Sequence, residues 1–314
     1  MKPDILLIGP LLETVVDTLD SAYTVHRLYE ADDPDALIEK IADNTTAVVT
    51  DGGKGVKANI LERLPQVKIV AVFGVGVDAV DLEYCKKNSI AVTNTPDVLS
   101  GDVADLAVAL MLAVSRNIVD SDNYVRAGHW ATQGNMPLTT RMFGKTAGII
   151  GMGSIGMEIA KRLEGFDMDV VYCNRNKRSD VSARYYDSAA NMAKDVDYLI
   201  VAASASESTF KMVNTDVLTA LGSGGYLINI SRGTLIDQDA LIEALDKNTI
   251  KGAGLDVFVD EPNVPQALID MKNVVLQPHQ ASATLDTRKA MGKLVTDNLA
   301  RFFDGRPLIT QYTR

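Results

Sequence analysis

The chain has 314 residues, of which 46% are hydrophobic and 23% charged, and this composition is typical of a globular protein large enough for two domains. Its net charge of −10 at pH 7 argues against nucleic acid or an anionic membrane surface as a partner. Two cysteines, no Cys/His cluster of the kind that binds metal and no N-terminal secretion signal together predict a cytoplasmic protein without a metal site. The longest apolar stretch, residues 103–114, contains Asp105 and is shorter than the about 20 residues that span a bilayer, so we expect a buried helix there.

Strand-like and helical patterns alternate through the first hundred residues. Strands are predicted at residues 5–8, 47–50, 69–73 and 91–93, and helices at 11–19, 35–44 and 59–64. Such alternation predicts a parallel sheet covered by helices on both faces.

A second and longer α/β series begins near Ser100, which is a plausible N-cap of the following helix. Its strands are predicted at residues 147–150, 170–173, 199–202, 226–229, 254–257 and 274–276, and a last helix at 284–303. We therefore expect an α/β fold of two domains, Rossmann-like or flavodoxin-like, each built on a parallel sheet.

A glycine motif, Gly151-x-Gly153-x-x-Gly156, joins the first strand of this second series to a helix. Gly151 would allow the tight turn, Gly153 would let a pyrophosphate approach the backbone, and Gly156 would let the helix pack on the sheet. The motif lies between two predicted strands, so we expect a dinucleotide at residues 151–156, with Ser154 and Ile155 at the start of the helix.

The loop after the next strand indicates which dinucleotide binds. An NAD site usually has an acidic residue there, whereas this chain has Asn174, Arg175, Lys177 and Arg178. A ribose 2′-phosphate would be attracted to these cations, above all to the planar fork of Arg175. The sequence therefore favours NADPH/NADP over NADH, which would bind more weakly. The alternative is an ordinary solvated basic loop.

Three later strands each end in a residue capable of catalysis. Arg232 follows one buried strand, Asp256 and Glu261 follow the next, and His279 follows the third. Ligand contacts in open α/β sheets lie at such carboxyl ends of strands.

At these residues the chain resembles the D-isomer-specific 2-hydroxyacid dehydrogenase family. Segments 229–233, 254–262 and 278–282 are similar to its three signature blocks, residues 73–78 to its substrate loop and 151–156 to its cofactor loop. The resemblance covers nearly the whole chain. It implies a discontinuous substrate domain of residues 1–99 and 285–314 around a Rossmann domain of residues 100–284, and usually a homodimer. Trp130, in the loop after the long helix, is expected to make packing or dimer contacts.

The resemblance also implies that Arg232, Glu261 and His279 form the catalytic set, and the chemistry of a small 2-oxo acid substrate fits these residue types. Arg232 can bond carboxylate and carbonyl oxygens, and His279 can donate a proton to the developing alkoxide. Glu261 would orient the imidazole and favour its protonated form. The N–H groups of Val75 and Gly76 would bind the substrate carboxylate. Ile230, Asp256 and His279 are further expected contacts of the nicotinamide cofactor, and the alternative for Asp256 is a structural role at the strand end.

Within the family, the basic loop resembles that of NADPH-linked glyoxylate/hydroxypyruvate reductases. The segment after the catalytic histidine also resembles that of 2-ketogluconate reductases, in which case Gln280 would bind hydroxyl groups of a longer substrate. A different class of function stays open, namely a non-enzymatic protein that senses NAD(P)(H) through a dehydrogenase fold.

Overall fold

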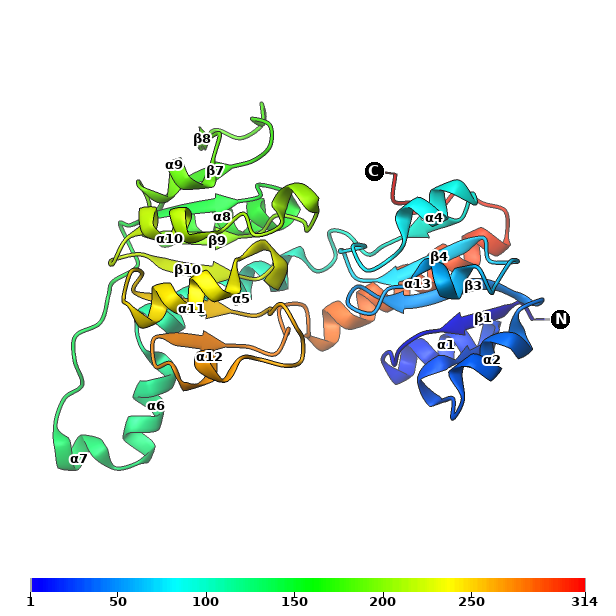
Figure 1. Cartoon of the computed structure of the whole chain (residues 1–314), viewed down its shortest axis with the longest axis horizontal. Coiled ribbons are helices and arrows are strands. Elements are labelled where there is room, and N and C mark those ends of the chain that lie inside the picture. The colour runs from blue at the N-terminus through cyan, green and yellow to red at the C-terminus, as the bar shows by residue number, and fades with distance from the viewer. Residues whose placement is uncertain (1, 314) are drawn as a thin grey trace. The chain divides into compact units, whose positions relative to one another are not determined.

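The computed structural model describes residues 2–313, and they form two compact units. Unit 1 comprises residues 1–99 and 283–314, and unit 2 comprises residues 100–282. Each unit is built around one parallel sheet (Figure 1), so the α/β class expected from the alternating pattern is confirmed. No helix within residues 2–313 is long and apolar enough to cross a membrane.

The sheet of unit 1 has the strand order β2-β1-β3-β4-β5, in which every pair is parallel. This order is that of flavodoxin-like folds. The strands are β1 (Asp4–Leu7), β2 (Thr24–Arg27), β3 (Thr45–Asp51), β4 (Ile69–Phe73) and β5 (Ala91–Thr93). The helices are α1 (Glu13–Ala22), η1 (Leu28–Glu30), α2 (Pro34–Ile41), α3 (Ala58–Leu61), α4 (Leu82–Lys87) and α13 (Leu285–Phe303).

Burial explains this arrangement. All five residues of β4 are buried, as expected for an inner strand covered on both faces. The long helix α13 packs on β4 and α1, although some 180 residues separate it from the rest of the unit in sequence. Its Met291, Val295 and Leu299 form a buried stripe, and the hydroxyl of Thr284 caps its N-terminus by accepting a hydrogen bond from the N–H of Thr287.

The sheet of unit 2 has the order β12-β11-β10-β9-β6-β7-β8, again entirely parallel. Strand order reverses between β6 and β9, and ligands bind at such a switch point in doubly wound folds. The strands are β6 (Thr146–Ile150), β7 (Asp169–Cys173), β8 (Arg184–Tyr186), β9 (Tyr198–Val201), β10 (Tyr226–Asn229), β11 (Gly252–Leu255) and β12 (Val274–Leu276). The helices are α5 (Ser100–Ser115), α6 (Ile118–Arg126), α7 (His129–Gln133), α8 (Ser154–Glu164), α9 (Ala189–Ala193), η2 (Glu207–Thr209), α10 (Thr215–Leu221), η3 (Gly233–Leu235), α11 (Gln238–Asp246) and α12 (Gln266–Asp270).

The predicted buried helix is α5, and nine of its sixteen residues are buried. The prediction that Ser100 caps this helix is wrong. The turn at residues 98 and 99 leads the backbone directly into α5, so Ser100 is the first helical residue. Its buried hydroxyl finds no hydrogen-bond partner among residues 2–313.

Several short elements were not predicted. Strands β2 and β8 lie at sheet edges and carry polar, partly exposed residues, so neither shows the apolar run of an inner strand. Helices α6 and α7 contain no buried residue and so lack an apolar stripe. Trp130 accordingly lies in a helix, α7, and not in the loop expected for it.

Candidate active site

The glycine loop after β6 has the geometry that its motif requires. Gly151 has φ of +98°, and a Cβ at this position would lie 2.5 Å from the backbone nitrogen of Ala203. A Cβ on Gly156 would lie 2.2 Å from the carbonyl oxygen of Gly151, so only glycine allows α8 to start this close to β6. A Cβ on Gly153 would meet no atom within 4 Å, which leaves open space beside the backbone where α8 begins. This loop therefore has room for a pyrophosphate at a helix N-terminus.

The loop after β7 holds the glycine loop through the backbone of Met152. The Met152 N–H donates to Asn174 Oδ1 (2.7 Å), and the Met152 carbonyl accepts from Arg178 Nη1 (2.7 Å). The Arg178 guanidinium also binds the carboxylate of Asp180, and the Arg178 N–H donates to the hydroxyl of Tyr172 (3.0 Å). Two of the predicted phosphate ligands, Asn174 and Arg178, thus bind groups of the protein itself.

Arg175 and Lys177, in contrast, are both exposed. Arg175 Nη2 donates to Ser208 Oγ (2.7 Å), and Ser208 Oγ lies 3.0 Å from Ser206 Oγ. Arg175 follows β7 and Ser208 follows β9, and these strands flank β6 on its two sides. The two serines were not among the predicted site residues, because exposed loop serines carry no sequence signal that separates them from ordinary solvated ones.

The loop that carries His279 is held by a buried carboxylate. Asp256 follows β11 and is fully buried, and it accepts hydrogen bonds from the N–H groups of Gln280 (2.7 Å) and Ala281 (3.0 Å). The His279 N–H donates to the Asp256 carbonyl (2.9 Å), and His279 itself has φ of +53°. Burial raises the pKa of Asp256, and the two N–H donors oppose that shift. Asp256 thus fixes an unusual backbone conformation at His279.

Glu261 and His279 form the hydrogen-bonded pair that the sequence predicts. Glu261 Oε2 lies 2.7 Å from His279 Nδ1, and Glu261 Oε1 accepts from the N–H of Phe258 (3.0 Å). Burial alone would raise the pKa of Glu261, but the hydrogen bonds from His279 and Phe258 and the attraction of Arg232 outweigh it, so the pKa is lowered. Glu261 is therefore a carboxylate that orients the ring through Nδ1.

Arg232 lies in a turn fixed by a buried asparagine. Asn229 Nδ2 donates to the Arg232 carbonyl (2.9 Å), and Asn229 Oδ1 accepts from the N–H of Ser231 (3.1 Å). A Cβ on Gly233 would lie 2.0 Å from the carbonyl carbon of Phe258, so the turn packs directly on the segment that leads to Glu261. Strand ends far apart in sequence thus bring Arg232 close enough to act on Glu261 electrostatically.

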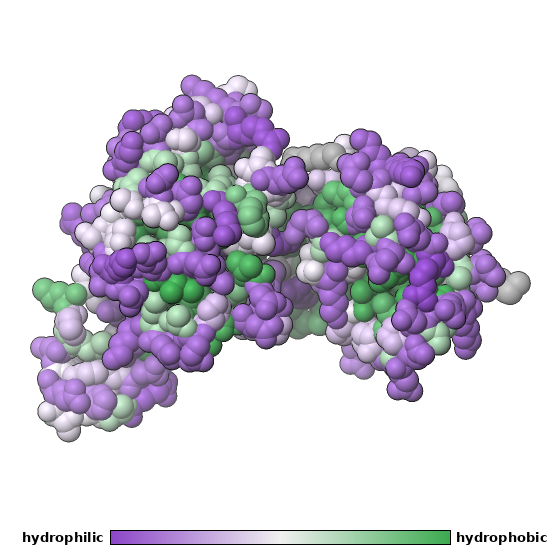
Figure 2. Space-filling view, in the orientation of Figure 1, coloured by the Kyte–Doolittle hydropathy of each residue, from purple (hydrophilic) through white to green (hydrophobic). Residues whose placement is uncertain are grey.

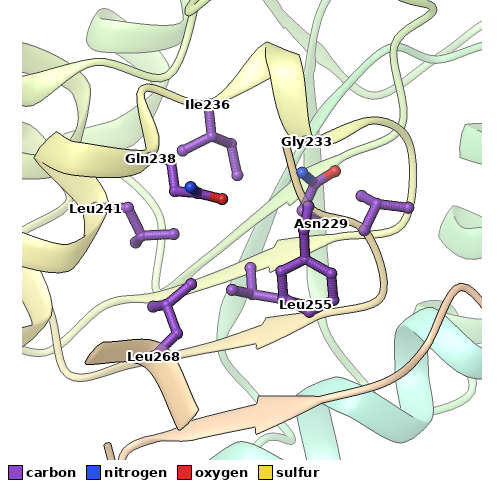
Figure 3. Close-up of a pocket in the computed structure, with 9 residues that line it drawn as sticks. Asn229, Gly233, Ile236, Gln238, Leu241, Leu255 and Leu268 are labelled. Carbon is purple, nitrogen blue, oxygen red and sulfur yellow. The ribbon is translucent and has the colours of Figure 1, made fainter. Parts of the chain in front are cut away.

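A small cavity lies under these loops (Figure 3). Apolar side chains line most of it, from β11, α11, α12 and the loops after η3 and β11, and Asn229 and Gln238 are its polar members. The residues that line it are Asn229, Gly233, Ile236, Gln238, Leu241, Leu255, Val257, Phe258 and Leu268. Since Asn229 already binds the Arg232 turn, this mainly apolar space does not suit an anionic substrate.

In unit 1, the predicted substrate loop follows β4 and keeps its donors open. The Gly74 carbonyl accepts from the Thr95 N–H (2.8 Å), and the Val75 carbonyl accepts from Asn94 Nδ2 (2.9 Å). The N–H groups of Val75 and Gly76 donate no hydrogen bond to any group of residues 2–313. With its carbonyls held, this loop offers two N–H groups to an anion.

Comparison with known proteins identifies the family. Residues 108–281 match the NAD-binding domain of the D-isomer specific 2-hydroxyacid dehydrogenases. The chain belongs to this family. The matched range contains the glycine loop, Arg232, Glu261 and His279, and it accounts for the second sheet as a nicotinamide-binding domain.

Relatives of full length support the same membership of the 2-hydroxyacid dehydrogenase family. The chain is 42% identical to glyoxylate/hydroxypyruvate reductase A of Arabidopsis thaliana, over 98% of this chain and 97% of that protein. It is 41% identical to 2-ketogluconate reductase of Gluconobacter oxydans, over 98% of each chain. The crystal structure of an NADPH-dependent glyoxylate/hydroxypyruvate reductase from Sinorhizobium meliloti, in complex with NADP and malonate, superposes with a TM-score of 0.93 at 38% identity, covering 100% of this chain and 97% of that one.

The remaining predicted contacts of this 2-hydroxyacid dehydrogenase lie on the same edge of the sheet in unit 2. Ile230 is buried just after β10, and Ser154 and Ile155 open α8. Gln280 is exposed, with its side chain 3.5 Å from the Pro278 carbonyl, and its backbone N–H is used by Asp256.

Proposed function

We propose that this protein reduces a small 2-oxo acid, glyoxylate or hydroxypyruvate, to the D-2-hydroxy acid with NADPH. The observation that carries the proposal is the Glu261–His279 pair, 2.7 Å apart, on a loop fixed by the buried Asp256. Reductases of these two substrates are also among the full-length relatives at about 40% identity.

His279 is the proton donor of the proposed reaction. Because Glu261 occupies Nδ1, the donor is Nε2, which makes no hydrogen bond within residues 2–313. The Glu261 carboxylate holds the ring through Nδ1 and so fixes the orientation in which Nε2 can meet a substrate. Arg232 bonds the substrate carbonyl oxygen and carboxylate, and Val75 and Gly76 bind the carboxylate through their N–H groups.

The nicotinamide cofactor, when bound, supplies the hydride. We assign residues 100–284 to the cofactor domain, and residues 1–99 with 285–314 to the substrate domain. The open space beside Gly153 and the turn at Gly151 suit the pyrophosphate, with Ser154, Ile155 and Gly156 at the start of α8. Ile230 and Asp256, at the ends of β10 and β11, contact the nicotinamide end of the cofactor.

NADPH is preferred over NADH because Asn174 stands directly after β7, where an NAD site usually has an acid, and the same loop offers two exposed cations. Arg175 and Lys177 are the proposed ligands of the 2′-phosphate, since both are exposed and neither is paired with an acid within residues 2–313. Ser208, which accepts a hydrogen bond from Arg175, holds the guanidinium between the loops that follow β7 and β9.

We further propose a homodimer formed through the arm of α6 and α7. This arm exposes Val119, Val125 and Trp130, and the lower left of Figure 2 shows small hydrophobic areas among hydrophilic ones. Light scattering should give twice the chain mass of 33.9 kDa, and a charged residue in place of Trp130 should shift the mass toward the monomer. A monomeric wild-type protein would contradict the dimer.

A 2-ketogluconate reductase is the second candidate, favoured by the exposed Gln280 beside His279 and by the relative with that activity. Initial rates with NADPH and NADH against glyoxylate, hydroxypyruvate, 2-ketogluconate and phenylpyruvate separate the candidates. We expect NADPH-dependent turnover of a short 2-oxo acid. Cofactor binding without turnover of any of these acids would favour a redox sensor.

A further inference from the structure

Arg288, at the carboxyl edge of the sheet in unit 1, has no acidic partner among residues 2–313. Arg288 lies in the first turn of α13 and is half-buried, and its guanidinium stacks over the ring of Phe73, with Cζ 5.5 Å from the ring centroid. It makes no hydrogen bond or ion pair with any group of residues 2–313. Its N–H donors are therefore left to solvent or to a ligand.

The nearest acid does not neutralise Arg288. Asp51, at the end of β3, attracts the guanidinium from beyond ion-pair distance, and its Oδ1 already accepts from the N–H groups of Gly53 (2.9 Å) and Lys54 (2.8 Å). Burial lowers the pKa of Arg288 more than Asp51 raises it, which means that the environment disfavours the cation. A chain with a net charge of −10 has many acids, yet none within residues 2–313 forms an ion pair with Arg288.

Arg288 contacts the residue that directly precedes the loop with the open donors. Its ring contact, Phe73, is the last residue of β4, and the loop with the unbonded N–H groups of Val75 and Gly76 begins at the next residue. Among residues 2–313, a half-buried arginine without an acid and a nearby loop whose N–H groups lack acceptors together suit an anion. Among anions, a carboxylate matches the paired N–H groups of a guanidinium.

We propose that Arg288 is a specificity-determining residue that binds the carboxylate of the 2-oxo acid, together with the N–H groups of Val75 and Gly76. This inference rests on the proposed reduction of a 2-oxo acid, and it adds a substrate contact from the helix α13. The Phe73 ring keeps the guanidinium in place before the substrate arrives, which limits the entropy lost on binding.

The test replaces Arg288 with Met, which keeps a long apolar stem on Phe73 and removes the charge, and with Lys, which keeps the charge and removes the fork. Lys289→Met is the matched control, because it removes one positive charge from the exposed neighbouring residue of the same helix. We expect Arg288→Met to raise the KM for glyoxylate roughly 10- to 100-fold, Arg288→Lys to raise it less, and the control to leave it unchanged. The KM for NADPH should stay the same in all three variants.

A second measurement does not need turnover. Oxamate, a carboxylate analogue of glyoxylate, should bind the wild-type protein with NADPH in calorimetry, and Arg288→Met should lose this affinity by a similar factor. Oxamide, its uncharged counterpart, should bind weakly and equally to both.

The outcomes separate this inference from the proposed function. If the wild-type protein reduces glyoxylate and Arg288→Met has the KM and oxamate affinity of the control, Arg288 is not a substrate ligand while the proposed function stands. If no 2-oxo acid is reduced but oxamate binding still depends on Arg288, the proposed activity fails and the carboxylate site stands. If Arg288→Met lowers the melting temperature but binds oxamate as tightly as the control does, the contact with Phe73 is structural only, and the inference is overturned.

Discussion

Two regions at the carboxyl edge of the sheet in unit 2 hold their polar side chains in opposite ways. In the first region, Asp256 and Glu261 follow β11 and His279 follows β12. The carboxylates of the two acids accept hydrogen bonds from N–H groups and pair with the His279 ring. After β7, Arg175 and Lys177 are exposed and without an acidic partner among residues 2–313. Proton transfer requires a ring in one orientation, whereas discrimination between two cofactors requires charge that no internal acid neutralises.

In the loop after β7, Arg178 differs from Arg175 and Lys177. It follows β7 like Arg175, but its guanidinium binds Asp180 and the Met152 carbonyl. We therefore expect residues of the first region to control the rate, Arg175 to control the choice of cofactor, and Arg178 to control the shape of the glycine loop. The predictions below test this division, from the largest expected effect to the smallest.

Replacing His279 with Asn should have the largest effect, because it removes the proposed proton donor from the loop after β12. We expect kcat for the reduction of glyoxylate to fall about 10²- to 10⁴-fold, with the dissociation constant for NADPH nearly unchanged. Steady-state rates and a fluorescence titration of NADPH measure the two quantities. A kcat close to that of the wild type would mean that the proton comes from another group.

Replacing Arg175 with Ala should change cofactor choice. The KM for NADPH should rise roughly 10- to 100-fold, because charge-assisted bonds to the 2′-phosphate are lost, and the KM for NADH should change little. Arg184→Ala is the matched control, since Arg184 is an exposed arginine of the same unit on β8. Equal increases for both cofactors would contradict the assignment of Arg175.

Replacing Arg178 with Met should instead weaken both cofactors to the same degree, by several-fold. The change releases the Met152 carbonyl and so loosens the loop that holds the pyrophosphate, which NADH and NADPH share. The ratio of the two KM values reports this directly. A selective loss of NADPH would show that Arg178 binds the 2′-phosphate, as the sequence first indicated.

Asp256 and Glu261, the two acids that bind the His279 loop, should have opposite effects on stability as the pH changes. The pKa of Glu261 is lowered, so its contribution is fully present above its ordinary value of 4.5 and is lost as the pH falls through the lowered pKa. The pKa of Asp256 is raised, so its contribution is fully present below 3.8 and is lost as the pH rises through the raised pKa.

These two pH dependences are tested by the melting temperatures of Glu261→Gln and Asp256→Asn, measured against the wild type at several pH values from about 3 to 7. The amount by which Glu261→Gln melts below the wild type should grow with rising pH, and the corresponding amount for Asp256→Asn should shrink. Deficits that change in the same direction would show that one of the two assignments is wrong. In activity, Glu261→Gln should also lower kcat, because the ring loses the carboxylate that fixes its orientation.

The sequence predicts the inner strands and the positions of the proposed catalytic residues at strand ends, because both have local signals. Inner strands such as β4 are continuous apolar runs, and Arg232, Glu261 and His279 lie directly after such runs. Glu261 and His279 could be placed at strand ends, and the parallel sheet then brings them to one edge. The glycine turn was predictable for the same reason, since its φ and its close contacts permit only glycine at residue 151.

The other contacts of the candidate site depend on the conformations of the loops that follow the strands. Nothing in the residue order shows that Arg178 meets Met152 while Arg175 meets Ser208, because both contacts depend on the path of the loop after β7. Asp256 was expected near the nicotinamide, and its hydrogen bonds to two N–H groups of the His279 loop could not be predicted from spacing. Arg288 had no signal, since an arginine in an amphipathic helix is usually solvated and its missing acid becomes evident only in three dimensions.

The most direct test of the central claim is a single turnover with hydroxypyruvate. The wild-type protein is loaded with NADPH and mixed with this 2-oxo acid, and the loss of NADPH absorbance is followed together with the product. The account predicts one D-glycerate formed for each NADPH consumed. Tight binding of NADPH with no loss of absorbance, for hydroxypyruvate and for glyoxylate alike, would contradict it.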